Sequence, residues 1–130
     1  MSRHARWSTA LALAVAGCSD PAPNTASGAP PADELRIGLD EYEVRASHTS
    51  ALPETLTLEI TNTGREAHDL RVDGAGDPIA TEVLAPGEAT VIEVDAAGAD
   101  ELALWCTLPG HRSQGMQTTL TVTGADGRGS

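Results

Sequence analysis

The segment from Trp105 to Met116, WCTLPGHRSQGM, places a thiol, an imidazole and a thioether within twelve residues. The three donors are Cys106, His111 and Met116, with the spacing C-x4-H-x4-M. Thiolate and thioether sulfurs suit Cu(I), and imidazole suits Cu(II). Pro109 and Gly110 predict a turn that brings His111 back towards Cys106. The segment therefore predicts a transition-metal site on a loop.

The chain around this loop has the pattern of short β-strands. Leu56, Leu58 and Ile60 alternate with polar residues, and turn signals such as Asn62-Thr63-Gly64 and Pro86-Gly87 separate the apolar runs. Repeated short strands of this kind predict an antiparallel sandwich or barrel. The expected strands lie near residues 35–46, 55–61, 67–72, 81–84, 89–95, 101–107 and 116–123.

The alternation also orients the donors, because successive side chains of a strand point to opposite faces. A donor that shares a face with Leu and Val points into the core. The groups that share a face are His68 with Leu70 and Val72, Cys106 with Leu102 and Leu104, and Met116 with Thr118, Leu120 and Val122. Each donor alone would more often be a packing residue. Two His, one Cys and one Met together match the donor set of a blue copper site.

Three segments resemble the cupredoxins, which are small Greek-key blue copper proteins. They are GREAHDLRV around His68, LAPGEAT at 84–90, and WCTLPGHRSQGM followed by the strand TTLTVTG. The loop spacing resembles that of the rusticyanin and auracyanin type, and the resemblance covers about residues 33 to 124. It implies a Greek-key β-sandwich or barrel of seven to eight strands. It also implies one copper ion, cycling between Cu(I) and Cu(II), with the ligands His68, Cys106, His111 and Met116.

One residue departs from the family pattern. Many cupredoxins have Asn directly after the first ligand His, where it ties the two ligand loops together, whereas this chain has Asp69. An ionised carboxylate accepts hydrogen bonds and cannot donate them. We expect Asp69 to accept from backbone N–H groups or from a hydroxyl such as that of Thr107. A solvated surface position is the alternative.

The resemblance implies a one-electron carrier rather than an enzyme. Electrons would pass through the exposed edge of His111, with Leu108, Pro109 and Gly110 as an apolar collar. Trp105 would point outward and offer a second route, or would serve only as a packing residue. A His beside the copper Cys, which connects to further copper in multicopper oxidases and nitrite reductases, is missing, and a binuclear centre would need a second Cys in this loop.

Two other metal functions stay open on the residues alone. Copper delivery or storage would use the same donors, although Met116 and Met1 are the only methionines, which is few for a Met-rich transport surface. A structural zinc site would use Cys and His but would leave Met116 unexplained. The remaining histidine of the expected domain, His48, is predicted to lie in a loop.

The composition restricts the partners. The net charge is −11, with 19 acidic and 8 basic residues, which argues against nucleic acid. We expect a monomer whose redox partners have a basic docking patch, with an attraction that weakens as salt is added. The chain has no Phe, so its core must come from Leu, Val, Ile and Ala.

The N-terminal residues have the layout of an export signal. Residues 1–17 combine Arg3 and Arg6 with a short apolar stretch, and Val15-Ala16-Gly17-Cys18 resembles the bacterial lipobox. We expect a lipoprotein signal, lipidation of Cys18 and a location outside the cytoplasm, in the periplasm or on the outer face of the cell membrane. An ordinary secretory signal is the alternative. Residues 18–34 are predicted to be a lipid-anchored flexible linker, 35–123 the copper-binding domain and 124–130 a disordered tail.

Overall fold

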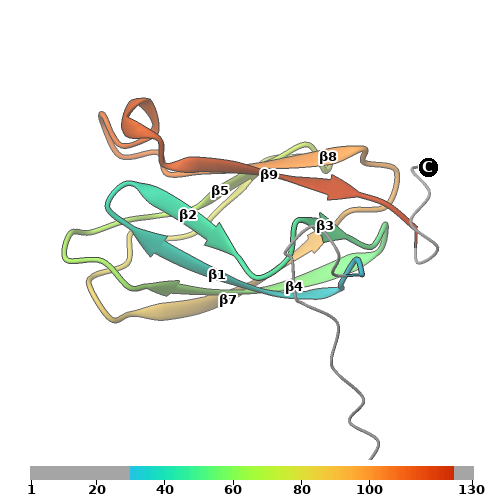
Figure 1. The fold of residues 1–130 in the computed structure, drawn as a ribbon, viewed down its shortest axis with the longest axis horizontal. Helices are drawn as coiled ribbons and strands as arrows, with labels where there is room; N and C mark the ends of the chain where they lie inside the picture. Colours follow the sequence, from blue (N-terminus) through green and yellow to red (C-terminus); the bar gives the residue numbers. More distant parts are fainter. Residues whose placement is uncertain (1–29, 125–130) are drawn as a thin grey trace, which may run out of the picture.

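The computed structural model describes residues 30–124 and folds them into a two-layer β-sandwich (Figure 1). The predicted all-β sandwich is confirmed. Its strands are β1 (Glu34–Asp40), β2 (Glu43–Ala46), β3 (Ser50–Ala51), β4 (Thr55–Asn62), β5 (Arg71–Asp73), β6 (Ile79–Ala80), β7 (Ala89–Asp95), β8 (Glu101–Trp105) and β9 (Gln117–Val122). Within residues 30–124, no helix is long and apolar enough to cross a membrane.

The two sheets have different strand orders. One sheet has the order β2-β1-β4-β7 and the other β3-β9-β8-β5-β6. Most neighbours are antiparallel, while β1 lies parallel to β4 and β3 lies parallel to β9. Ala32 already pairs with Ala51 ahead of β1. His48 lies outside the strands, between β2 and β3, as predicted.

The segment predicted as one strand over 35–46 is a hairpin of β1 and β2. Its register places Asp40 opposite Glu43, so that only two residues form the turn. Buried positions are odd-numbered in β1, as at Leu39, and even-numbered in β2, as at Val44. A two-residue turn produces this change of parity, because the chain reverses while the same face stays buried. The prediction missed the turn because it contains neither Gly nor Pro.

The strand predicted over 67–72 is shorter than expected, and the one predicted over 81–84 is wrong, because β6 already ends at Ala80. β5 begins only at Arg71, and His68 pairs with Leu84 through an isolated bridge. Between these pairings the backbone N–H of Leu70 donates to the side-chain Oγ1 of Thr81 at 3.0 Å. A side-chain acceptor in place of a backbone carbonyl interrupts the regular ladder there.

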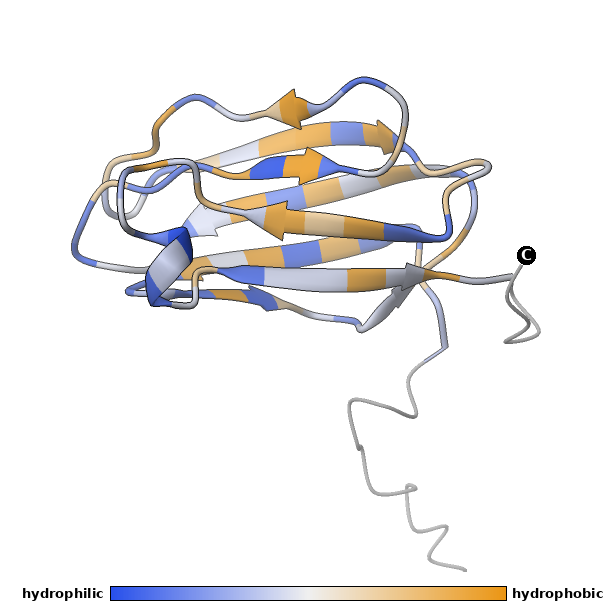
Figure 2. Cartoon of the chain, turned by 90° about the horizontal axis from the view of Figure 1, so that it is seen from above, coloured by the Kyte–Doolittle hydropathy of each residue, from blue (hydrophilic) through white to orange (hydrophobic). Residues whose placement is uncertain are grey.

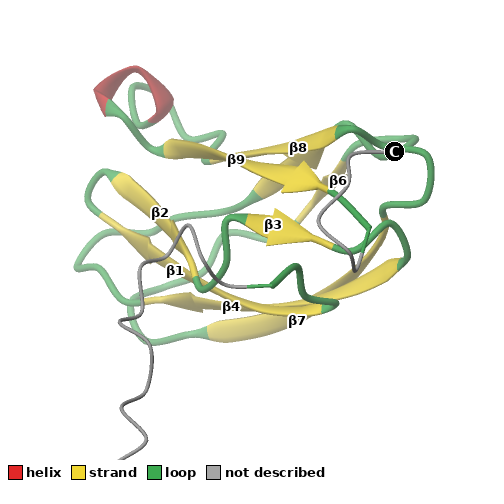
Figure 3. Ribbon diagram, turned by 45° about the vertical axis from the view of Figure 1, so that its right-hand side comes forward, coloured by secondary structure: helices red, strands yellow, loops and turns green. Residues whose placement is uncertain are grey.

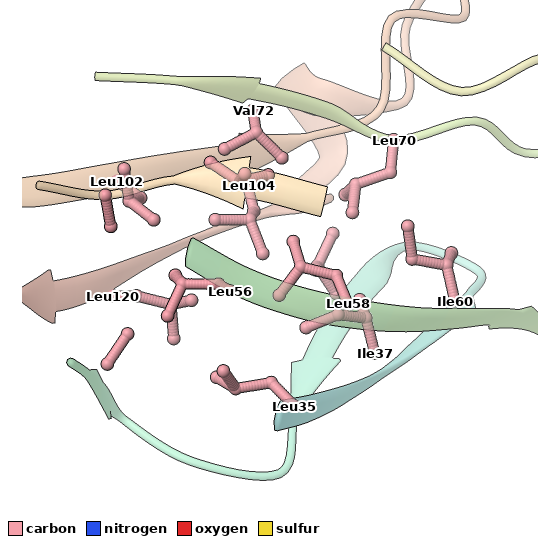
Figure 4. Packing of buried hydrophobic residues seen from close by; sticks show 14 of the residues in the cluster. Leu35, Ile37, Leu56, Leu58, Ile60, Leu70, Val72, Leu102, Leu104 and Leu120 are labelled. Carbon is pink, nitrogen blue, oxygen red and sulfur yellow. The ribbon is translucent and has the colours of Figure 1, made fainter. Parts of the chain in front are cut away.

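The core lies between the sheets. Figure 2 shows hydrophobic and hydrophilic residues alternating along the strands. In Figure 4, Leu35, Ile37, Leu56, Leu58 and Ile60 of one sheet face Val72, Leu102, Leu104 and Leu120 of the other, together with Leu70, which directly precedes β5. Aliphatic side chains therefore fill the core of this Phe-free chain, as expected from its composition.

Four connections meet at one end of the sandwich. They are the β1–β2 turn, the segment 63–70, the segment 81–88 and the segment 106–116, which contains the 3-10 helix η2 (Arg112–Gln114). Figures 1 and 3 show the η2 loop above the β1–β2 hairpin at this end. The topology therefore brings together the segments that contain His68, Cys106, His111 and Met116.

Replacing Leu58 by Ala should lower the free energy of unfolding by about 2–5 kcal/mol, because the side chain is fully buried and would leave a cavity. Chemical denaturation measures this change. Val91→Ala is the control, since Val91 is 59% exposed and should cost less than about 0.5 kcal/mol. Equal losses for both variants would contradict the described core.

Candidate metal centre

His68 is placed by the turn that follows Leu84. The two residues exchange backbone hydrogen bonds, with N···O distances of 3.1 and 2.7 Å. The chain then turns at Ala85-Pro86-Gly87-Glu88, closed by a bond from the Glu88 N–H to the Ala85 carbonyl. Gly87 has a φ of +85°, which the third position of such a Pro-Gly turn requires. The LAPGEAT segment therefore fixes the backbone of the first ligand histidine.

Buried Asn62, at the end of β4, connects the segments 63–70 and 81–88. Its side-chain Nδ2 donates to the carbonyls of Glu66 at 2.8 Å and Leu84 at 2.9 Å. Its Oδ1 accepts from the N–H of Gly64 at 2.9 Å. The amide thus hydrogen-bonds to the backbone of both segments, including the Leu84 carbonyl that also accepts from the N–H of His68. The alternation of β4 contained a signal for it, because Asn62 falls on the buried parity of Leu58 and Ile60.

Backbone hydrogen bonds join the two ends of the loop between β8 and β9. The N–H of Cys106 donates to the carbonyl of Met116, and the N–H of Met116 donates to the carbonyl of His111, both at 3.2 Å. Gly115 ends η2 with a φ of +112°, a conformation that favours glycine. These bonds bring the three donors of the loop together. The predicted turn at Pro109-Gly110 lies within this loop.

The donors converge on one point. The Nδ1 atoms of His68 and His111 lie 3.2 Å apart, and the Sγ of Cys106 lies 3.5 Å from Nδ1 of His111. One donor atom from each of the three residues lies within 4.8 Å of the others. Met116 is fully buried in the same core cluster. Two ring nitrogens that face each other so closely need a proton or a metal cation between them, so the arrangement fits a cation.

Burial raises the pKa of the Cys106 thiol. Hydrogen bonds from the backbones of Asp69 and Leu108 act in the opposite direction. A thiolate is the form that binds metal, and a cation at the site favours loss of the proton. Metal binding and release of the thiol proton are therefore linked at this site.

The outer nitrogen of His68 faces a carboxylate that the sequence did not point to. Nε2 lies 3.0 Å from Oε1 of Glu41, in the β1–β2 turn. The same oxygen accepts from the N–H groups of Arg65 at 2.6 Å and Glu66 at 2.7 Å. The bond from Glu66 is the main reason that the pKa of Glu41 falls to about 2, and the bond with His68 adds to it. An ionised acceptor holds the N–H on Nε2 and leaves Nδ1 as the ligand atom.

Gly64 makes the Glu41 contact possible. A Cβ at this position would lie 2.3 Å from the Glu41 carboxylate oxygen. A side chain at residue 64 would therefore displace the end of the flexible Glu41 side chain from its present position. Glu41 and His68 are 27 residues apart in the chain, and no local motif joins them.

His111 lies nearer the surface than His68. Its side chain is 13% exposed, whereas that of His68 is fully buried. Nε2 lies 3.7 Å from Oε2 of Glu66, and the ring of Tyr42 packs edge-on at 5.1 Å. Glu66 and Tyr42 were not predicted to belong to the site. The exposed edge of His111 therefore has an acidic and an aromatic neighbour beside its loop.

Asp69 connects the two ligand segments. It accepts from the backbone N–H of Thr107 at 2.7 Å, and its other oxygen accepts from the Thr107 hydroxyl. Asp69 is 6% exposed, so it is not a solvated surface residue. The bonds are those expected from the sequence, and they join the residue after His68 to the residue after Cys106.

The remaining predicted residues lie around the loop. Leu108 is half-buried against the core, and Pro109 and Gly110 are exposed beside it. Trp105 is half-buried, and its indole N–H donates to Asp73 at 2.7 Å. Cys18 and the proposed signal and tether up to residue 29 lie outside the described residues.

Comparisons agree with this geometry. Residues 32–123 match the family of copper binding proteins, plastocyanin/azurin family. A search of curated proteins gave no significant match. An auracyanin of Roseiflexus castenholzii is similar in structure, with a TM-score of 0.59 and 18% identity over 72% of this chain and 98% of that chain.

Two further auracyanins have similar folds. The structure of auracyanin B gives a TM-score of 0.58 and 22% identity over 73% of this chain and 91% of that chain. Auracyanin A of Chloroflexus aurantiacus gives 0.55 and 18% over 69% of this chain and 98% of that chain. At these identities, the structural likeness concerns the fold.

The fold and the donor set together define a small blue copper protein. The chain belongs to the plastocyanin/azurin family of copper-binding proteins. Its single type 1 copper site consists of His68, Cys106, His111 and Met116. This confirms the predicted metal and ligands, and a weak thioether ligand is typical of such sites.

Replacing Asp69 by Ala should lower the free energy of unfolding by about 1.5–3 kcal/mol, because two hydrogen bonds to a charged acceptor are lost. Chemical denaturation measures the loss. Asp77→Ala is the control, since Asp77 is exposed. An Asp69→Asn protein with unchanged copper affinity and reduction potential would contradict an orienting role for the carboxylate.

Replacing Glu41 by Gln should weaken Cu(II) binding by about 10–100-fold, the usual effect of losing an outer partner of a ligand histidine. The reduction potential should also rise, because a nearby negative charge favours the more positive oxidised ion. Competition with a chelator and voltammetry measure the two changes. Glu43→Gln removes an exposed carboxylate two residues away. The same shift in this control would assign the effect to net charge alone.

Proposed function

We propose that this protein is a one-electron carrier without a substrate of its own. Copper supplies a one-electron change between Cu(I) and Cu(II). The observation that supports this function is the unequal exposure of the two ligand histidines. His68 and Cys106 are fully buried, whereas His111 reaches the surface with 13% of its side chain exposed. Buried ligands retain the ion, and one exposed ring edge offers a short path for an electron.

The surface around His111 suits close approach of a partner. Leu108, Pro109 and Gly110 present small or apolar groups beside the ring, and Trp105 offers a second path through the neighbouring Cys106. We propose these four residues as the electron-transfer surface. Asp69 and Thr107 would hold the loop in place through their hydrogen bonds. Redox proteins are the proposed partners, and the acidic chain favours basic docking patches on at least one of them.

The proposed location is outside the cytoplasm. Lipidation of Cys18 would anchor the protein at a membrane, and the residues up to 34 would form the tether. The export-signal layout of residues 1–17 and the lipobox-like Val15-Ala16-Gly17-Cys18 support this location. A tethered monomer could then move between membrane-associated or periplasmic partners.

Adding Cu(II) to the metal-free protein should produce an intense blue absorption band, because the Cys106 thiolate binds the ion directly. The band should disappear in a Cys106→Ser variant and bleach reversibly with a reductant. Absorption spectroscopy measures both. A colourless protein that holds only Cu(I) would overturn the carrier proposal and indicate copper delivery or storage. A preference for zinc would indicate a structural metal.

A further inference from the structure

We infer that the outer face around Trp105 is a docking surface for the carboxylates of a redox partner. This partner would be distinct from the one that approaches His111. The inference rests on the proposed carrier function, because a carrier needs both a donor and an acceptor. We call this face the Arg–Trp surface and define it by Arg71, Asp73, Trp105, Arg112 and Gln117.

The sheet register builds this surface from three strands. Trp105 of β8 lies opposite Arg71 of β5 and opposite Gln117 of β9. Residues that are paired directly lie on the same face of a sheet. Because the neighbouring residues Leu104 and Cys106 are buried, Trp105 points to the outer face. The row Arg71, Trp105 and Gln117 therefore crosses the sheet immediately outside the copper ligand Cys106.

Two arginines flank the indole ring. The guanidinium carbon of Arg112 lies 4.2 Å from the ring centroid and that of Arg71 lies 5.5 Å from it. Gln117 accepts from Nε of Arg112 at 3.1 Å, and Asp73 accepts from Nε of Arg71 at 3.0 Å. The guanidinium groups are thus held in place by cation–π contacts and hydrogen bonds. Such pre-ordering lowers the entropy lost when a carboxylate binds.

The local charge is opposite to that of the chain. Residues 30–124 contain five arginines against seventeen acidic residues, and two of these five flank Trp105. Asp73 pairs with Arg71, while Arg112 has no ion pair with any carboxylate among the described residues. Arg112 is also exposed. A positive site therefore remains on an otherwise acidic protein, and positive guanidinium groups bind carboxylates well.

The surface at His111, where the first of the two proposed electron paths leaves the copper site, is acidic rather than basic. Glu66 lies 3.7 Å from Nε2 of His111, so a basic group of a partner is favoured there. The surface at His111 and the Arg–Trp surface therefore differ in charge. Electrostatic steering would direct partners of opposite charge to the two surfaces. A partner with surface carboxylates would meet Trp105, and a partner with basic residues would meet His111.

The test uses two paramagnetic, redox-inert complexes as probes of the surface. Hexacyanochromate(III) is anionic, and tris(ethylenediamine)chromium(III) is cationic. NMR spectra of both the Cu(I)-loaded and the metal-free protein report line broadening near each bound complex. We expect the anion to broaden the Trp105 indole N–H signal and the cation to leave it sharp. Broadening of this signal by the cation, or by neither complex, would overturn the inference.

Arg112→Gln should remove the anion-induced broadening at Trp105. Arg36→Gln is the matched control, because it removes the same charge from an exposed position on β1, in the opposite sheet. Equal broadening in wild type and Arg112→Gln would contradict the proposal. The metal-free spectra stay informative if copper gives no blue site, so failure of the carrier proposal is distinguishable from failure of this one.

A kinetic measurement extends the test to electron transfer. One electron passes from the reduced protein to hexacyanoferrate(III), which becomes hexacyanoferrate(II). Arg112→Gln should slow this reaction by about two- to five-fold at low salt, and added salt should reduce the difference. Arg36→Gln should leave the rate near that of the wild type. Binding to phosphatidylglycerol vesicles that is lost only in Arg112→Gln would instead assign the surface to a membrane.

Discussion

Burying metal donors at one end of an apolar core is the constraint on which the rest of this structure depends. His68 and Cys106 are fully removed from solvent, and a buried polar group is costly unless it has partners. The outer nitrogen of His68 therefore faces Glu41, and the loop beyond Cys106 is bound to Asp69. Each donor is left with one atom directed at the common point. The metal site is thus the part of the core where polar groups are satisfied by one another and by copper.

The supporting contacts come from segments that are distant in the chain. The β1–β2 turn supplies Glu41, the end of β4 supplies Asn62, and the segment after His68 supplies Asp69. Each contact joins segments that are separate in the chain, so the positions of His68 and Cys106 do not depend on a single loop. Little rearrangement is then needed when the charge of the metal changes, which suits the proposed transfer of electrons.

Charge is distributed unevenly over this acidic protein. Acidic residues predominate in the chain, and Glu66 lies at the exposed edge of His111. The two arginines beside Trp105 form a local exception that is held by cation–π contacts. Net charge alone describes only the average field. The arrangement of a few side chains decides which partner charge each exit from the copper would favour.

Much of this arrangement could be predicted from local patterns. The alternation of Leu56, Leu58 and Ile60 predicted a half-buried strand, and the spacing of Cys106, His111 and Met116 predicted the metal loop. The hairpin at 41–42 was missed because its turn lacks Gly and Pro, although the parity of the buried residues changes across it. The same alternation could have predicted that Asn62 is buried, since it occupies a buried position of β4.

The sequence by itself determined the sheet periodicity, the donor types and the loop that brings three of them together. These properties depend on neighbours within a few residues, which is why the sequence pattern shows them. Only the tertiary structure decided which carboxylate faces His68 and which arginines flank Trp105. Glu41 lies 27 residues from His68, and Arg71 meets Trp105 through strand pairing. Such contacts arise from the packing of the two sheets and the register of their strands. Patterns among residues that are close in the sequence specify neither of these.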